Sequence, residues 1–406
     1  MVGIVEYISY ISIFASLYFE VFLLISFLEN KEVHNDEEFT PGVTVLVPCF
    51  NEEKTVQGTL ESLLQLDYPK EKVNIIVIND GSTDNTREIL KAYENNPQIQ
   101  IHDKVNGGKY TALNLGISLA TTDFIGCLDA DSFVDKDALR LIMKRFQNEN
   151  TMAVTPSMIV DKPNNILREM QKAEYHFGNF TRKSLSILGA IHITPGPFSF
   201  FRKEVFQKIG LYRHAHNTED MEMAMRMQKN GMVIENEPKA HVFTVGPDTV
   251  KKLYRQRVRW VSGFLGNMID YREMLFNKKY GNLGIVVLPF AVFGLVAALT
   301  LIAITAYNTL INIWTEFAKL YIVGLGDFSI GSFDWFYINT SAITMLSFLL
   351  LSLTIFSVFF GQKLATGKWK LSISPLYFVF LYSFLLPFWL LKAVYNNAVR
   401  KDASWR

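Results

Sequence analysis

Four long apolar stretches dominate the pattern of hydrophobic and polar positions along the chain. Each is about as long as the ~20 residues that a helix needs to cross the hydrocarbon core of a bilayer. The pattern predicts an N-terminal transmembrane helix over residues 1–28 and a C-terminal transmembrane region over residues 284–406 with about three helices. The apolar stretches themselves cover residues 7–28, 284–306, 336–360 and 371–395.

Two features of the first stretch bear on its role. Residues 1–10 contain no Lys or Arg, whereas a cleaved signal peptide begins with a positively charged segment, so we expect an uncleaved anchor. Glu20 lies inside the stretch. Because ionisable residues at membrane depth usually face other helices or a wet path, Glu20 either lines a conduit or lies near the membrane interface.

Residues 29–283 lack any membrane-length apolar stretch and hold most of the charge, so we expect them to lie on one side of the membrane. Within this block, β-branched runs alternate with segments of helical period. This alternation predicts an α/β fold with an open parallel sheet and right-handed crossovers. The expected strands are 43–49, 73–79, 124–128 and 152–155, and the expected helices are 55–66, 87–93, 111–120 and 137–146.

Polar clusters follow three of the expected strands. In open α/β sheets ligands bind beyond the carboxyl ends of the strands, so these clusters are expected to meet at one edge. The clusters are Asn51-Glu52-Glu53, Asp80-Gly81-Ser82 and Asp129-Ala130-Asp131.

The triplet that begins at Asp129 is a candidate metal site. Side chains alternate along an extended chain, so the carboxylates of Asp129 and Asp131 would point the same way and could hold Mg²⁺ or Mn²⁺. A cation held there would neutralise a diphosphate leaving group. The triplet alone also occurs as a helix cap, and its position after a buried strand favours the metal site.

Asp80 and Lys109 are candidate nucleotide contacts. Asp80 ends the second strand, and its carboxylate could accept a hydrogen bond from a nucleotide base; the alternative is an Asx turn or a helix cap. Lys109 follows a glycine pair that opens a helix, where a point charge near phosphates is expected. The Gly-Lys-Ser/Thr ending of a phosphate-binding P-loop is absent.

Thr218-Glu219-Asp220 opens a segment of helical period. A carboxylate at this point could act as general base toward an acceptor hydroxyl, and an N-capping aspartate is the structural alternative.

Gln256, Arg259 and Trp260 are spaced i, i+3 and i+4, so a helix would present them on one face. A guanidinium suits a diphosphate, and an indole can stack on a sugar ring. An interfacial membrane helix with a snorkelling Arg and Trp is the competing interpretation.

Composition narrows the function classes. The 40 basic and 39 acidic residues nearly cancel, so no global positive field recruits nucleic acid, and we expect none as a partner. Cys49 and Cys127 are too few for a disulfide framework or a cysteine metal site, and both are expected to be buried free thiols.

Loop charges predict the orientation in the membrane. The loop 362–370 is rich in lysine, whereas 307–335 carries only Lys319 among several acids, which favours a cytoplasmic soluble domain. The basic C-terminal tail disagrees, because four spans would place it outside. Either the basic tail is tolerated outside, or a re-entrant segment within 307–335 changes the number of membrane spans.

Assembled in this order, the motifs resemble those of the processive family 2 glycosyltransferases, which include the hyaluronan, chitin, cellulose and poly-N-acetylglucosamine synthases. The motifs span residues 43 to about 270. Phe50 stands where members of the group often have Tyr. The residues that carry the resemblance are Pro48-Cys49-Phe50-Asn51-Glu52, Asp80, Lys109, Asp129, Asp131, Gly196-Pro197-Phe198, Thr218-Glu219-Asp220 and Gln256-Arg257-Val258-Arg259-Trp260.

The resemblance implies a fold and a set of roles. The fold is the Rossmann-like glycosyltransferase-A domain between transmembrane helices. Glu52, Asp80, Lys109 and Asp129 would bind the nucleotide-sugar, with Asp80 on the uracil, and Asp131 with Asp129 the metal. Asp220, with Glu219, would be catalytic. Gln256, Arg259, Trp260, Gly196 and Pro197 would contact the acceptor and the diphosphate.

The implied reaction is an inverting transfer of a sugar, N-acetylglucosamine or a related one, from a UDP-sugar to a growing polysaccharide, coupled to export across the membrane. A homo-oligomer or an export helper is a possible partner. One rival is a non-processive enzyme that glycosylates a membrane lipid. A transporter or receptor with a degenerate nucleotide domain conflicts with the intact acidic residues, and a nicotinamide oxidoreductase conflicts with the absent GxGxxG turn.

Overall fold

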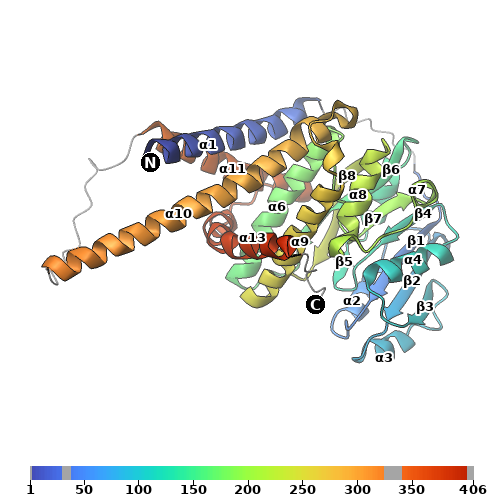
Figure 1. Cartoon of the computed structure of the whole chain (residues 1–406). Helices are drawn as coiled ribbons and strands as arrows, with labels where there is room; N and C mark the ends of the chain where they lie inside the picture. Colours follow the sequence, from blue (N-terminus) through green and yellow to red (C-terminus); the bar gives the residue numbers. More distant parts are fainter. Residues whose placement is uncertain (1, 30–37, 324–340, 400–406) are drawn as a thin grey trace.

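A mixed β-sheet with helices on both faces forms the soluble part of the molecule, and long apolar helices extend from one side of it (Figure 1). The computed structural model describes residues 2–29, 38–323 and 341–399. Within these residues the sheet has eight strands in the order β3-β2-β1-β4-β7-β6-β8-β5. The strands are β1 Val43–Cys49, β2 Val73–Asp80, β3 Ile99–Lys104, β4 Phe124–Cys127, β5 Ser132–Val134, β6 Thr151–Val160, β7 Ser199–Arg202 and β8 Val233–Thr244.

The half of the sheet that contains β3, β2, β1 and β4 is parallel, as expected from its β-branched runs. Val43 on β1 pairs with Val73 on β2 and with Phe124 on β4. Val45 and Val47 are fully buried because helices cover both faces of this half. Beyond β4 the sheet is mixed, since β7, which was not expected, runs antiparallel between β4 and β6.

Two helical layers enclose the sheet. The first apolar layer joins α2, α3 and α5 to one face, and the second joins α4, α6 and α8 to the other. The four helices expected before residue 147 end within two residues of their predicted bounds. The domain helices are α2 Val56–Leu64, α3 Thr86–Lys91, α4 Lys109–Leu119, α5 Ala138–Arg145, α6 Ile166–Ile187, α7 Lys203–Ile209, α8 Glu219–Lys229 and α9 Val250–Asp270, with 3₁₀ turns η2 Lys70–Lys72, η3 Ala215–Asn217, η4 Arg272–Met274 and η5 Lys278–Tyr280.

Four helices of the described residues are long and apolar enough to cross a membrane: Val5–Glu29, Leu283–Ile322, Ala342–Thr366 and Ser374–Ala398. Residues 307–323, part of the segment considered for re-entry, continue α10 as helix; the rest of that segment, the start of the third expected span and the basic residues after 399 lie outside the described residues. The individual elements are α1 Val2–Ile25, η1 Ser26–Glu29, η6 Leu283–Val287, α10 Leu288–Val323, α11 Ala342–Thr366, α12 Ser374–Tyr377, η8 Phe378–Tyr382 and α13 Ser383–Ala398.

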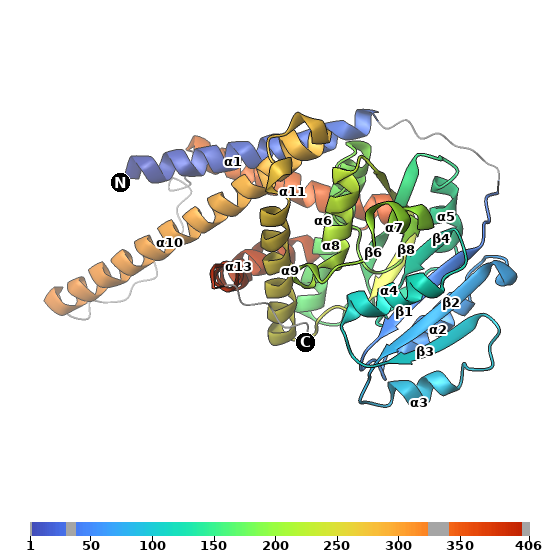
Figure 2. The ribbon, with the colours of Figure 1, turned by 45° about the vertical axis from the view of Figure 1, so that its right-hand side comes forward.

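The apolar helices meet the domain through α6 and α9. α11 packs on α6 and α13 packs on α9, while α1 and α10 run side by side away from the sheet (Figures 1 and 2). Glu20 on α1 is buried and accepts a hydrogen bond from Thr354 on α11 at 3.2 Å. Glu20 thus faces another helix, and its role in a conduit stays a prediction.

Candidate active site

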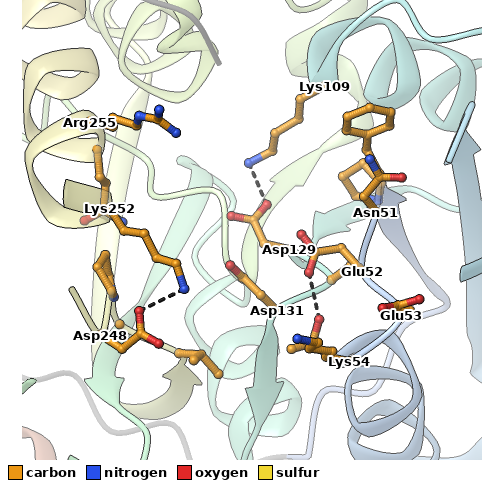
Figure 3. A pocket seen from close by; sticks show the side chains of 18 of the residues that line it. Asn51, Glu52, Glu53, Lys54, Lys109, Asp129, Asp131, Asp248, Lys252 and Arg255 are labelled. Atoms are coloured by element: carbon orange, nitrogen blue, oxygen red, sulfur yellow. Dashed lines mark hydrogen bonds and ion pairs between the residues drawn. The ribbon is translucent and has the colours of Figure 1, made fainter. Parts of the chain in front are cut away.

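A cleft of about 830 Å³ opens beyond the carboxyl ends of β1 and β4, with α9 as its opposite wall. Figure 3 shows acidic side chains on the strand side and Lys252 and Arg255 on the helix side. The predicted convergence of polar clusters at this edge is confirmed: the clusters after β1 and β4 line the cleft, and the cluster after β2 lies beside the first, with the Asn51 N–H donating to Ser82 Oγ at 3.1 Å. The predicted site residues that line the cleft are Glu52, Lys109, Asp129, Asp131, Gln256 and Arg259.

Lys109 links two other predicted site residues. It is the first residue of α4, and its Nζ lies 2.5 Å from Asp129 Oδ1 and 3.4 Å from Glu219 Oε1. Burial alone would lower the pKa of Lys109, but the carboxylates of Asp129 and Glu219 outweigh burial and hold this pKa well above its usual value. Lys109 is therefore a fixed positive charge on the floor of the cleft.

Asp131 lies among other carboxylates. Burial, with the charges of Asp129 and Glu52 next in size, raises the pKa of Asp131 to about 7. Glu52 is oriented by Thr55, whose hydroxyl donates to Glu52 Oε2 at 2.8 Å. Carboxylates that repel each other in this way are stabilised when a cation binds between them.

The donor set fits a divalent cation that is shared with a substrate. Within the described ranges, no group of three or more His, Cys, Asp or Glu side chains could hold a metal ion by itself. Mg²⁺ is commonly bound through one or two carboxylates, with substrate phosphates and water completing the shell. Asp131 and Asp129 could supply those carboxylates.

Asp220 lies in the first turn of α8. Its Oδ1 accepts the backbone N–H of Met221 at 2.9 Å, and its carbonyl oxygen accepts the hydroxyl of Thr194 at 2.9 Å. Burial and then the neighbouring Glu219 raise the pKa of Asp220 to about 6. An aspartate with this pKa is ionised at neutral pH and can still take up a proton.

Asp80 does not line the cleft. Its buried carboxylate accepts the backbone N–H groups of Gly107 and Gly108 at 3.0 and 2.9 Å and lies 2.5 Å from Lys104 Nζ. Asp80 thus holds the turn that leads into Lys109, and its bonds are those of neither an Asx turn nor a helix cap in its own segment. Its contact with a nucleotide base stays a prediction.

Gly196 lies directly against the Lys109 cluster. A Cβ at this position would lie 2.5 Å from Lys109 Nζ and 3.1 Å from Asp129 Oδ2, so any larger residue would displace the end of the lysine side chain. The next residue, Pro197, is buried, and Phe198 adopts a left-handed φ of 59°. The turn places backbone, and no side chain, beside the lysine.

Of the three residues predicted on α9, two line the cleft and the third does not. Gln256 and Arg259 line the cleft, and Arg259 Nη1 donates to the carbonyl of Asn217 at 3.1 Å. Trp260 does not line it, and its ring instead lies under the guanidinium of Arg257 at 4.2 Å. Arg257 also donates to Glu174 on α6 at 2.5 Å.

Lys252 and Arg255 line the cleft although sequence reasoning passed over them. With Arg259 they recur at i, i+3 and i+7 along α9, which is the period of one helix face. That spacing could have identified these three residues in the sequence as one basic face of the helix, here called the basic wall. Lys252 pairs with Asp248 at 2.8 Å.

Cys49 and Cys127 are free and buried, as predicted. Burial raises the pKa of both thiols, which disfavours the nucleophilic thiolate form.

Comparison with known proteins decides the family. The model of glycosyl transferase family 2 matches residues 44–210. The poly-beta-1,6-N-acetyl-D-glucosamine synthase of Staphylococcus epidermidis is 33% identical over 297 residues, which are 71% of this chain and 71% of that protein. The synthase of that name from Staphylococcus aureus strain COL is 34% identical over 281 residues, 68% of this chain and 67% of that protein. The chain belongs to glycosyl transferase family 2.

The fold of this family 2 glycosyltransferase extends to its apolar helices. A mannosyltransferase from Pyrobaculum calidifontis, solved in complex with GDP-Man and Mn²⁺, is 18% identical and matches with a TM-score of 0.69 over 98% of both chains. The likeness confirms the glycosyltransferase-A fold expected from the motifs. It covers both the sheet domain and the helices that flank it.

Proposed function

We propose that this glycosyltransferase transfers N-acetylglucosamine from its UDP donor to a growing polysaccharide, at the cytoplasmic face of a membrane, and exports the product. The observation that carries the proposal is the identity with two poly-beta-1,6-N-acetyl-D-glucosamine synthases over about two thirds of the chain or more. The cluster of Lys109, Asp129 and Glu219 at the cleft supports it.

In the proposed reaction Asp220 takes the proton of the acceptor hydroxyl as this oxygen attacks the anomeric carbon, and the bond from that carbon to the diphosphate breaks. Lys109 and Arg259 provide positive charge for the departing diphosphate. Asp131 and Asp129 would hold Mg²⁺ or Mn²⁺, which when bound supplies further charge neutralisation. Glu219 keeps Lys109 in place.

Other site residues are proposed to bind and orient. Glu52 and Asp80 belong to the nucleotide side, although a base N–H would have to compete for the carboxylate of Asp80 with the Gly107-Gly108 turn. Gln256, Gly196 and Pro197 belong to the acceptor and diphosphate side. Trp260, held under Arg257, would present its free face to a sugar ring.

Export is supported by polar atoms buried at the junction of α9 and α13. In the described part of the chain, Arg257 Nε, Trp389 Nε1 and Asn396 Oδ1 are buried without hydrogen-bond partners. Buried polar groups normally have partners, and sugar hydroxyls could supply them. The lysine-rich loop 362–370 supports the proposed cytoplasmic orientation.

A donor assay tests the function. Purified protein in lipid nanodiscs is given labelled UDP-N-acetylglucosamine, UDP-glucose or UDP-glucuronate with Mn²⁺, beside Asp220→Asn. The proposal expects high-molecular-weight product from UDP-N-acetylglucosamine alone, lost in the variant. A small product soluble in organic solvent would instead establish the lipid-glycosylating enzyme. In sealed vesicles, polymer that stays on the side of the catalytic domain would refute export.

A further inference from the structure

The three residues before Thr218-Glu219-Asp220 have an unusual backbone. Ala215, His216 and Asn217 have φ angles of 45°, 54° and 59°, in the left-handed region that residues with a Cβ rarely adopt. Three such residues in succession, none of them glycine, do not persist unless the surroundings hold them. The structure therefore has to contain whatever holds this turn.

The surface that holds the turn is a notch on α9 made by two glycines. A Cβ at Gly266 would lie 2.6 Å from the ring of His216, and a Cβ at Gly263 would lie 2.3 Å from the side chain of Thr218. A side chain at either glycine would force the neighbouring side chain of the turn or of Thr218 to move. The turn, defined as residues 215–217, is thus seated against the bare backbone of α9.

Two polar contacts fasten the turn to the same helix, and a third fastens the next residue, Thr218. His216 Nε2 lies 3.0 Å from Asp270 Oδ2, and Arg259 Nη1 donates to the carbonyl of Asn217 at 3.1 Å. Asn267 Nδ2 donates to the hydroxyl of Thr218 at 2.9 Å. The contacts extend from Arg259, near the middle of α9, to its last residue, Asp270.

We propose that the turn is a positioning device and that His216 is its positioning residue: by filling the notch at Gly266, His216 fixes the start of α8 and so the carboxylate of Asp220. The inference rests on the proposed role of Asp220 as base. In this proposal α9 has two roles: it lines the cleft, and through Gly263 and Gly266 it positions the residue that acts in the chemical step.

The test is a coupling experiment on kcat. Gly266→Ala forces the ring of His216 out of the notch, so we expect kcat to fall at least tenfold while UDP binding with Mn²⁺ stays within twofold. In a His216→Gly background the obstructing ring is absent and glycine tolerates the left-handed φ. There, Gly266→Ala should cost less than twofold.

Gly178→Ala on α6 is the matched control, because a Cβ there meets nothing within 4 Å. It should change kcat less than twofold in both backgrounds. If Gly266→Ala costs the same in both backgrounds, or no more than Gly178→Ala, the proposal is wrong.

A variant without steric change covers the case in which Gly266→Ala does not fold. Asp270→Asn removes the charge beside His216, and we expect a lower kcat with unchanged UDP affinity; an unchanged kcat would count against the proposal. The assays use whichever donor the wild type turns over. Failure of the UDP-N-acetylglucosamine proposal is therefore visible in the wild type, separately from the coupling.

Discussion

Arg257 lies with its guanidinium 4.2 Å from the centre of the Trp260 ring, in the middle of the helix that forms one wall of the cleft. Its Nη2 donates to Glu174 at 2.5 Å, and the arginine side chain is almost completely buried. The ion pair of Arg257 and Glu174 therefore ties α9 to α6, the helix on which α11 packs.

Breaking this pair should destabilise the fold. Arg257→Met leaves Glu174 as an uncompensated buried charge, so we expect the free energy of unfolding in detergent to fall by about 3–5 kcal/mol. Adding Glu174→Leu should recover most of that loss. Lys251→Met, on the exposed side of the same helix, is the control and should change stability by less than about 0.5 kcal/mol. Equal stability of Arg257→Met and wild type would contradict the prediction.

Asp220 should determine the acid limb of the pH profile. Its pKa is raised to about 6 by burial and then by Glu219, and a general base acts only when ionised. With saturating Mn²⁺, kcat/KM should fall about tenfold per pH unit below about pH 6 and level off above it. Glu219→Gln removes a charge that raises this pKa, so the break should move to lower pH. A break that stays in place would exclude Asp220 as the titrating group.

Gly196→Ala should impair binding of the donor more than folding. The new Cβ would meet the end of the Lys109 side chain at 2.5 Å, and a flexible lysine can move away from Asp129. Losing that charge-assisted contact costs about 1.5–3 kcal/mol, or roughly 10–100-fold in kcat/KM. Gly42→Ala, whose Cβ would only touch Thr122 at 3.4 Å, is the control. The assay compares kcat/KM with the melting temperature, and equal kcat/KM values for the two variants would contradict the prediction.

Divalent cations should stabilise the wild type through Asp131. At about 100 times its dissociation constant, Mn²⁺ should raise the free energy of unfolding by about 2.7 kcal/mol, and chelation should remove both this gain and the activity. Asp131→Asn should lose the gain, whereas Asp123→Asn at an exposed position should keep it. Stabilisation that survives in Asp131→Asn would place the cation elsewhere.

The basic wall on α9 should attract the donor. Exchanging both Lys252 and Arg255 for alanine should raise the donor KM about tenfold at low ionic strength, with kcat within twofold, because their charges act on the approaching diphosphate. The effect should shrink at high salt, where the screening length is short. Lys251→Ala, one residue away and exposed, is the comparison that should leave KM unchanged.

In the parallel half of the sheet, β1, β2 and β4 were predictable because they are buried on both faces, whereas β3 Ile99–Lys104, in which only Ile99 is buried, and, outside this half, the three-residue β5 Ser132–Val134 were missed. Val43–Cys49 was predicted with its observed bounds, since such a run of β-branched residues has no competing helical period. Ser199–Arg202 and Val233–Thr244 were missed. The first is a short apolar run after a turn, and the second mixes charged and apolar residues because one side of it is only partly covered.

Local motifs predicted which residues lie near the cleft better than they predicted how those residues contact one another. The lysine-carboxylate cluster follows from residues that lie at the ends of strands or the starts of helices, which chain topology brings together. The spacing of Gln256, Arg259 and Trp260 suggested one shared face, but the stacking of Trp260 on Arg257 depends on Glu174 from α6. No pattern within α9 encodes a partner that distant in the chain.

Because α10 is longer than a bilayer core is thick, its far end can be used to determine the membrane topology of the protein. Its 36 residues rise about 54 Å, well beyond the ~30 Å of a hydrocarbon core, and its distal part carries Glu316 and Lys319 as an exposed ion pair. Cys49 and Cys127 are both buried. A cysteine placed at exposed Thr315 would therefore be the group that an impermeant maleimide reaches, and labelling in sealed, sided vesicles would report on which face of the bilayer this helix emerges.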